Sequence, residues 1–156
     1  MIVRGIEEKD DQVFKRLFDQ SFSEYLEFLK QENPQQYLKE LKERREVTRS
    51  GFNFYLKAGC SFVAEENGEV VGYVASQRVP SMYNVDLWIG YIVVQKEFRR
   101  RGIGLALLQK LKDYATSSSI NGIYAFINPD NEPSMRLHSK AGFNIEDWKI
   151  AVYETK

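Results

Sequence analysis

The chain has 156 residues, of which 43% are hydrophobic and 28% charged, and both values are typical of one globular domain spanning residues 1–156. Its 22 basic and 22 acidic residues cancel, so no overall field draws the protein to nucleic acid or to a membrane surface. Cys60 is the only cysteine, which excludes an internal disulfide and a cysteine-rich metal site. We expect no metal, and we expect a cytoplasmic protein because no segment has the length of a signal peptide or a membrane span.

The first residues predict a short strand and then a long helix. Alternation from Ile2 to Ile6 is typical of a strand. Asp10 or Asp11 can cap the helix that follows. Its aromatic and aliphatic residues recur at helical spacing, which favours core packing over a ligand pocket: Phe14, Phe18, Phe22, Tyr25 and Leu29.

A second helix is predicted to begin at Asn33–Pro34. Asn33 is the expected cap, Pro34 the first helical residue, and Gln36 the capping-box partner. The stretch 50–59 is ambiguous between a short helix and a loop, and it is rich in aromatic residues.

Strands follow in the middle of the chain. The segments 60–64 and 70–76 flank Asn67–Gly68, which is a strong hairpin signal. Residues 80–84 predict a second turn. The segment 87–94 is almost wholly apolar, so we expect a strand buried on both faces.

Helices and strands alternate in the last third. Helical spacing runs from 103 to 115 and ends at the serines 117–119, and a strand is expected at 123–127. A short helix follows at 131–140, stopped by Gly142. A final strand is expected from the alternation of Trp148, Ile150 and Val152. The order predicts an α/β fold of mixed α+β type, with one central twisted sheet of six to seven strands and helices on both faces.

The start of the helix at 103 carries the chemistry. Arg99, Arg100 and Arg101 stand directly before Gly102 and Gly104. A helix N-terminus leaves backbone N–H groups unpaired and carries a partial positive charge. Glycines let a ligand approach that backbone, and arginines add charge-assisted contacts. The segment therefore predicts a phosphate-binding turn.

Two other phosphate motifs do not match. A P-loop needs Gly-Lys-Ser/Thr, and here Gly104 is followed by Leu105 and Ala106. A dinucleotide-binding turn needs a small residue at Leu107 and an acidic residue about 20 positions later, where Asn121–Gly122 offers none. A helix start that binds nothing is the remaining alternative, and the arginines weigh against it.

At this point the sequence resembles the GNAT superfamily of N-acetyltransferases. The family signature Gln/Arg-x-x-Gly-x-Gly/Ala is matched by Arg99–Gly104, and a second block, Asn-x-x-Ser/Ala-x-x-Leu-Tyr-x-Lys-x-Gly-Phe, by Asn131–Phe143. The resemblance runs from about Cys60 to the end of the chain. It implies a GNAT-like fold in which the strands flanking the signature helix splay apart.

The resemblance also implies acetyl-CoA as cofactor. Its pantetheine arm is expected to pair with the backbone at Ile92, Val93 and Val94, with the N–H near Val94 as oxyanion donor. Asn131 and Ser134 match positions that face the cofactor or cap the last helix, and either role is open for Asn131. The pyrophosphate is expected on the N–H groups of Arg99, Arg100, Arg101, Gly102, Ile103, Gly104 and Leu105.

The expected catalytic residues depart from the family pattern. The usual general acid, a tyrosine, is replaced by His138, which has three open roles: proton donor, orienting group or packing. The usual glutamate base falls in register on Gly90 or its neighbours. Asp86 is the nearest acid on that strand, and a water relay or no dedicated base is also open.

These residues predict an enzyme that transfers an acetyl group from acetyl-CoA to a primary amine of a small molecule or protein. The acceptor site is expected between the N-terminal helices and the turn at 77–86. A non-catalytic acyl-CoA sensor of the same fold is the alternative. A nucleic-acid partner is disfavoured by Glu97 beside the arginines, no membrane partner is expected, and a homodimer is left open.

Overall fold

The structure, a computed structural model, describes residues 1–43, 47–153 and 155. The chain forms two compact units, Met1–Phe126 and Ile127–Lys156. The expectation of a single domain stays a prediction. None of the helices in the described ranges is long and apolar enough to cross a bilayer.

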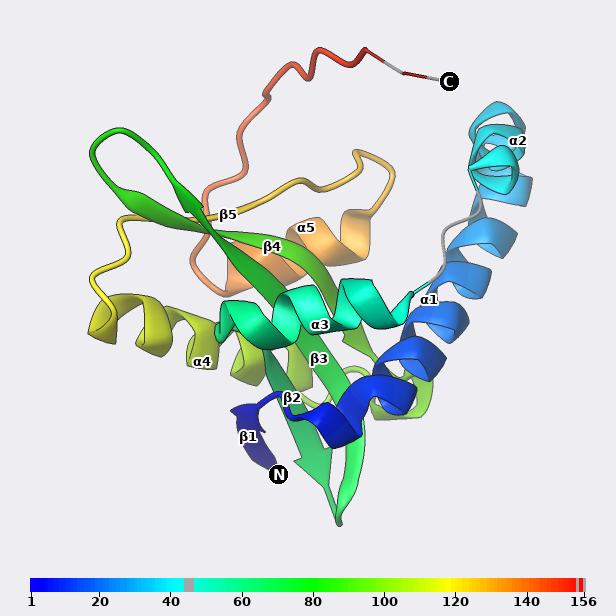
Figure 1. The fold of residues 1–156 in the computed structure, drawn as a ribbon. Helices are drawn as coiled ribbons and strands as arrows, with labels where there is room; N and C mark the ends of the chain where they lie inside the picture. Colours follow the sequence, from blue (N-terminus) through cyan, green and yellow to red (C-terminus); the bar gives the residue numbers. More distant parts are fainter. Residues whose placement is uncertain (44–46, 154, 156) are drawn as a thin grey trace. The chain divides into compact units, whose positions relative to one another are not determined.

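The first unit is built on one mixed sheet (Figure 1). Its strands lie in the order of the sequence: β1 (Ile2–Gly5), β2 (Phe62–Glu66), β3 (Glu69–Pro80), β4 (Val85–Val94) and β5 (Ile123–Ala125). Neighbours are antiparallel except β4 and β5, which run parallel. The mixed sheet is confirmed, but the described residues form five strands where six to seven were predicted.

The hairpin predicted at Asn67–Gly68 is confirmed. These two residues join β2 to β3 with φ angles of 52° and 82°. Two consecutive positive φ angles are the requirement of the tight turn that matches strand twist, and asparagine and glycine meet it at least cost.

The expectation that the fourth strand is buried on both faces is wrong. Leu87, Ile89 and Val93 are buried, whereas Gly90 and Tyr91 are exposed. The apolar run therefore lies in an alternating strand with one partly open face. The apolar sequence did not predict this exposure, because apolar and aromatic residues are also common on protein surfaces, above all on binding surfaces.

A β-bulge interrupts β4 at Gly90. Ala75 pairs with Tyr91 and Ser76 pairs with Ile89, so Gly90 has no partner on β3. Because the bulge inserts one extra residue, every residue after Gly90 points its side chain and backbone groups to the opposite side from the one that unbroken alternation would give.

Helices cover both faces of this sheet, as predicted (Figure 1). Helices α1 (Asp11–Glu32) and α3 (Arg49–Ala58) pack on one face and α4 (Ile103–Ser117) on the other. A Cβ built at Gly72 of β3 would lie 3.4 Å from Ile103 Cγ2, which places the start of α4 close to the sheet. The core on the α1 and α3 face is formed by Phe14, Leu17, Phe52, Val63, Val70, Tyr73, Ala75 and Val93.

The helix starts follow the sequence closely. Asn33 caps α2 (Pro34–Lys42) by accepting from the Gln36 N–H at 3.2 Å, as predicted. The Gln36 side chain does not return to Asn33 but bonds Glu40 one turn later at 2.8 Å. The ambiguous stretch 50–59 is helical, because Thr48 caps α3 and Gly59 ends it with a φ of 66°.

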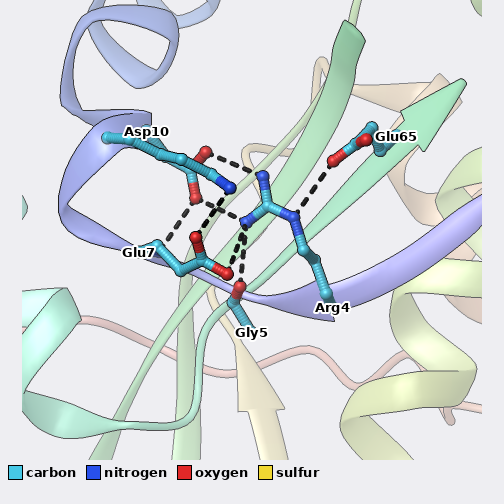
Figure 2. A network of polar contacts seen from close by, with 6 residues as sticks. Arg4, Gly5, Glu7, Asp10 and Glu65 are labelled. Carbon is cyan, nitrogen blue, oxygen red and sulfur yellow. Dashed lines mark hydrogen bonds and ion pairs between the residues drawn. The ribbon is translucent and has the colours of Figure 1, made fainter. Parts of the chain in front are cut away.

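The Asp10 carboxylate links the first strand to the first helix (Figure 2). It accepts from Arg4 at 2.8 and 3.0 Å and from the Glu7 N–H at 2.8 Å, within the short helix η1 (Glu8–Asp10) that leads into α1. Arg4 also pairs with Glu65 of β2 at 3.0 Å. The predicted cap is therefore wrong in detail: the Asp10 side chain serves this network and makes no cap hydrogen bond to α1.

The second unit contains the helix α5 (Glu132–Lys140), followed by Gly142 with a φ of 89°. The predicted last strand is not formed. Trp148, Ile150 and Val152 are 76%, 65% and 71% exposed, and the described residues of this unit include no strand that could pair with them. Alternation alone does not make a strand, since the backbone groups need a partner ladder.

Candidate functional site

One edge of β4 is open over its second half. The parallel strand β5 pairs only with Leu87, Trp88 and Ile89. Beyond Ile89, at the Gly90 bulge, the two strands part. The predicted splay between the strands flanking α4 is therefore present in the first unit.

The bulge decides which backbone groups face this open edge. The Gln95 N–H donates to the Val71 carbonyl of β3 at 2.8 Å. Since successive residues of a strand point to alternate sides, Ile92 and Val94 direct their N–H and C=O groups away from β3. The Val94 carbonyl accepts from Arg99 Nε at 2.8 Å. Within the described part of this unit, the N–H groups of Ile92 and Val94 have no strand partner.

The start of α4 presents unpaired backbone N–H groups in the first unit. Gly102 is the N-cap with a φ of 83°, and no side chain caps the helix. The Ala106 N–H bonds back to the Gly102 carbonyl at 3.0 Å, which leaves the N–H groups of Ile103, Gly104 and Leu105 unpaired within the described structure. Three convergent N–H donors and the helix dipole fit a phosphate group.

The three arginines have different surroundings. Arg99 is paired with Glu24 of α1 at 2.6 Å. Arg101 lies over the Phe98 ring and 3.8 Å from Glu66. Arg100 is exposed with a φ of 66°, and among the described residues its guanidinium has no hydrogen-bond or ion-pair partner. Arg100 is therefore the arginine available to a phosphate.

A cavity of about 440 Å³ adjoins the end of β4, within the size range of ligand sites. The Gln95 side-chain oxygen is buried and has no hydrogen-bond partner among the described residues, as expected of a group that meets a ligand donor. The cavity lies between α1 and the segment after β4, including the short helix η2 (Lys96–Phe98). Its lining is Leu17, Asp19, Gln20, Ser21, Ser23, Glu24, Val93, Val94, Gln95, Lys96, Glu97 and Arg99.

Asp86 lies away from these groups. It stands near the start of β4, where Asn121 Nδ2 approaches its carboxylate at 3.5 Å. Gly90 lies four positions further along the strand, which is about 13 Å. The structure therefore does not bring Asp86 to the open edge.

His138 is buried in α5, with 1% of its surface exposed. Its Nδ1–H donates to the Ser134 carbonyl at 2.8 Å, and its ring packs edge-on against Phe143. Burial lowers the pKa of His138 below its ordinary value, although the bond to Ser134 opposes this. Nε2 is buried without a partner among the described residues, so the neutral ring carries an unused acceptor there.

Asn131 and Ser134 lie together at the start of α5. The Asn131 side-chain oxygen accepts from the Ser134 N–H at 3.1 Å, so Asn131 is an N-cap in this structure. The Ser134 hydroxyl lies 3.4 Å from His138 Nδ1. Apart from Asp86, the predicted residues thus gather in two places: Ile92–Leu105 in the first unit, and Asn131, Ser134 and His138 in the second.

Sequence reasoning missed Tyr55 of α3. A Cβ built at Gly90 would clash with the Tyr55 hydroxyl and lie 3.2 Å from Tyr55 Cζ. Burial and the neighbouring Tyr91 raise the pKa of Tyr55 above its ordinary value. A glycine inside an apolar strand often marks the close approach of another group, so Gly90 was the one sequence feature that could have indicated this contact.

The open edge, the N–H groups of α4 and the cavity fit an extended amide-bearing chain that ends in phosphate, as acetyl-CoA does. Comparison with known proteins agrees with this chemistry. The chain is 33% identical over 92 residues to the N-alpha-acetyltransferase of Sulfurisphaera tokodaii, covering 53% of this chain and 54% of the relative. It is 32% identical over 79 residues to an L-2,4-diaminobutyric acid acetyltransferase of Nocardia farcinica, covering 51% and 40%. The chain thus spans about half the length of these curated relatives.

Solved structures share the fold. An aminoglycoside acetyltransferase from an uncultured soil metagenomic sample superposes with a TM-score of 0.74 at 17% identity, covering 99% of this chain and 95% of that one. A Thermus thermophilus protein superposes with a TM-score of 0.72 at 18% identity, covering 100% and 98%. The family model described as the acetyltransferase (GNAT) family matches residues 15–143, which include both the open edge and α5. The chain belongs to the acetyltransferase (GNAT) family.

Proposed function

We propose that this protein is an acetyl-CoA-dependent N-acetyltransferase that acts on a primary amine. The observation that carries the proposal is the junction of two features in the first unit: unpaired strand N–H groups at Ile92 and Val94, and the uncapped start of α4. GNAT enzymes use acetyl-CoA as acetyl donor, and its thioester supplies an activated acetyl group.

Each part of this site has a distinct task. The Ile92 and Val94 backbone would pair with the amide groups of the donor, with Val93 between them facing the core. The N–H groups of Ile103, Gly104 and Leu105 would hold the pyrophosphate, and Gly102 shapes the turn. Arg100 would add a charge-assisted contact. Arg99 and Arg101 hold the turn against Glu24 and Glu66.

In this proposal the proton-handling groups are His138 and Asp86, and their surroundings set the role of each. The lowered pKa of His138 keeps its ring neutral near pH 7, with the proton on Nδ1. This supports a role as hydrogen-bond acceptor and orienting group through Nε2 over a role as proton donor. Asp86, at its distance along β4, would receive the proton of the amine only through intervening water.

The identity of the amine does not follow from the relatives. One is named for 2,4-diaminobutyric acid, one for aminoglycosides and one for N-alpha groups. These acceptors share only an amine nitrogen, which must be uncharged to form the new carbon–nitrogen bond as the carbon–sulfur bond breaks.

Two measurements test the proposal in sequence. Calorimetric titration with acetyl-CoA should show saturable binding. The absence of binding heat at millimolar acetyl-CoA would reject the proposed function. Thiol release is then followed across a panel of primary amines. Binding without amine-dependent release from any member would favour the non-catalytic sensor of the same fold.

A further inference from the structure

The bulge in β4 creates a position from which a side chain would normally project. Gly90 provides none, and the Tyr55 hydroxyl from α3 occupies the space that a Cβ would take. Tyr91, the next residue on β4, packs its ring near Tyr55, with centroids 6.3 Å apart. A hydroxyl from a helix thus stands beside the point where β4 leaves β5.

Three aromatic rings extend this surface across the two strands. Trp88 lies opposite Tyr124 in the parallel register, with ring centroids 6.1 Å apart, and its ring lies 4.6 Å from that of Phe126. Tyr124 and Phe126 are 47% and 63% exposed. Contiguous exposed aromatic rings on a small domain mark a binding surface more often than chance.

These rings and the Tyr55 hydroxyl lie on the same face of the sheet. Trp88 pairs with Gln77, which shares the face of Tyr73 and Ala75 on β3, and that face packs against α1 and α3. The opposite face is filled, because Ile89 is buried there and α4, whose Leu107, Leu108 and Leu111 are buried, packs against β4. A second molecule can therefore reach a ligand bound at the open edge near Gly90 from the side of the sheet that α3 covers.

The surface formed by these rings and Tyr55 is mainly apolar, and its polar groups are the Tyr55 and Tyr124 hydroxyls and the Trp88 indole N–H. No carboxylate lies between Leu87 and Gln95, and Asp86 lies beyond Trp88 toward the hairpin tip. Burial raises the pKa of Tyr55, so its hydroxyl stays protonated and its oxygen can accept from an amine N–H.

We propose that Tyr55, Trp88, Tyr124 and Phe126 form the acceptor-binding surface, and that the acceptor is an amine carrying an aromatic or apolar group. The Tyr55 oxygen accepts a hydrogen bond from the amine and holds it beside Gly90, while the rings contact the apolar group. This inference rests on the proposed N-acetyltransferase function.

The test uses the two tryptophans of the chain. Trp148 is exposed in the second unit, so the full-length Trp148→Phe protein reports binding through Trp88 alone. We expect 2-phenylethylamine to change its emission saturably and 1,4-diaminobutane to cause no change at the same concentration. No saturable change with 2-phenylethylamine, or an equal change with both amines, would overturn the inference.

Two variants test whether the Tyr55 hydroxyl binds the amine. In the Trp148→Phe background, Tyr55→Phe should weaken 2-phenylethylamine binding about three- to tenfold, the value of one hydrogen bond, and leave acetyl-CoA affinity unchanged. Tyr83→Phe, which removes a hydroxyl that is 88% exposed in the hairpin turn, is the matched control and should have no effect. Equal affinity in the Tyr55 and Tyr83 variants would exclude the role.

Gly90→Ala provides an independent check, because its Cβ must displace the Tyr55 hydroxyl. It should weaken amine binding in the parent and add no further loss in Tyr55→Phe. Full additivity of the two changes would contradict the contact. If acetyl-CoA binds and other amines are acetylated while these tests fail, the inference fails and the proposed function stands; if acetyl-CoA does not bind, the function itself fails.

Discussion

Asp10 is the most buried acid of the first unit's polar network, with 2% of its surface exposed. Its carboxylate holds Arg4 on one side and the turn before α1 on the other (Figure 2). The hydrogen bond to Asp10 is the main reason that the pKa of Arg4 lies above its ordinary value. A carboxylate in this position orients the start of α1 and thereby the helix that lines the cavity.

We expect Asp10→Asn to lower the free energy of unfolding by about 2–4 kcal/mol, because it leaves the partly buried Arg4 without its main counter-charge. Urea unfolding measures this. Glu69→Gln is the control, since its pair with Arg16 at 3.5 Å is exposed and should contribute less than about 1 kcal/mol. Equal losses in the two variants would show that the network contributes no more than a surface pair.

His138 predicts a pH dependence of stability with a definite sign. Its folded pKa lies below its unfolded value, so the unfolded chain takes up the proton first as the pH falls. The stability contributed by the neutral ring is complete above a pH of about 6.5 and is lost as the pH falls below it. Wild type should lose more stability than His138→Gln across this window in urea unfolding, and identical losses would contradict the assignment.

The same variant bears on catalysis. We expect His138→Gln to lower kcat and to leave acetyl-CoA affinity nearly unchanged, because both hydrogen bonds of the ring are made to Ser134 within α5. The pH profile of kcat measures the role. An unaltered rate and profile would exclude any proton or orienting function of His138.

Among the helices and strands, the helix starts were predictable and the bulge was not. Caps such as Asn33 and the glycines at 68 and 102 carry a local conformational requirement that the sequence states directly. The bulge at Gly90 and the contact with Tyr55 depend on the register of β3 against β4 and on α3, which are distant in the chain. Local patterns do not contain that information.

The start of α4 gives a sharp prediction for cofactor binding. Gly104→Glu should abolish acetyl-CoA binding in calorimetry, since it places a carboxylate among the N–H groups that would hold phosphate. Gly104 is not among the glycines of positive φ, and an acid in the first turn favours a helix, so the fold should persist.

Lys110→Gln is the control for this change. It shifts the charge of α4 by the same amount on its exposed side, and it should bind acetyl-CoA with nearly wild-type affinity. Retained binding in Gly104→Glu, or an equal loss in both variants, would place the cofactor elsewhere.

Across the full chain, hydrophobic periodicity and turn residues were enough to predict a mixed sheet with helices on both faces. The last strand failed because the alternation of Trp148, Ile150 and Val152 does not specify a partner. The same distinction between local and long-range features applies to the site. The turn at 99–105 is local and could be proposed as a phosphate site from its residues, a role that stays a prediction, whereas the surface around Tyr55 joins α3, β4 and β5 and required the structure.

The junction of the β4 edge and α4 is proposed to bind acetyl-CoA so that an amine can be acetylated. The decisive measurement incubates the full chain with acetyl-CoA and a panel of primary amines, and follows both free thiol and acetylated amine by mass spectrometry. We predict equal amounts of the two products, formed only when both substrates are present and lost in Gly104→Glu. Thiol release without acetylated amine, or equal product from Gly104→Glu, would contradict this assignment.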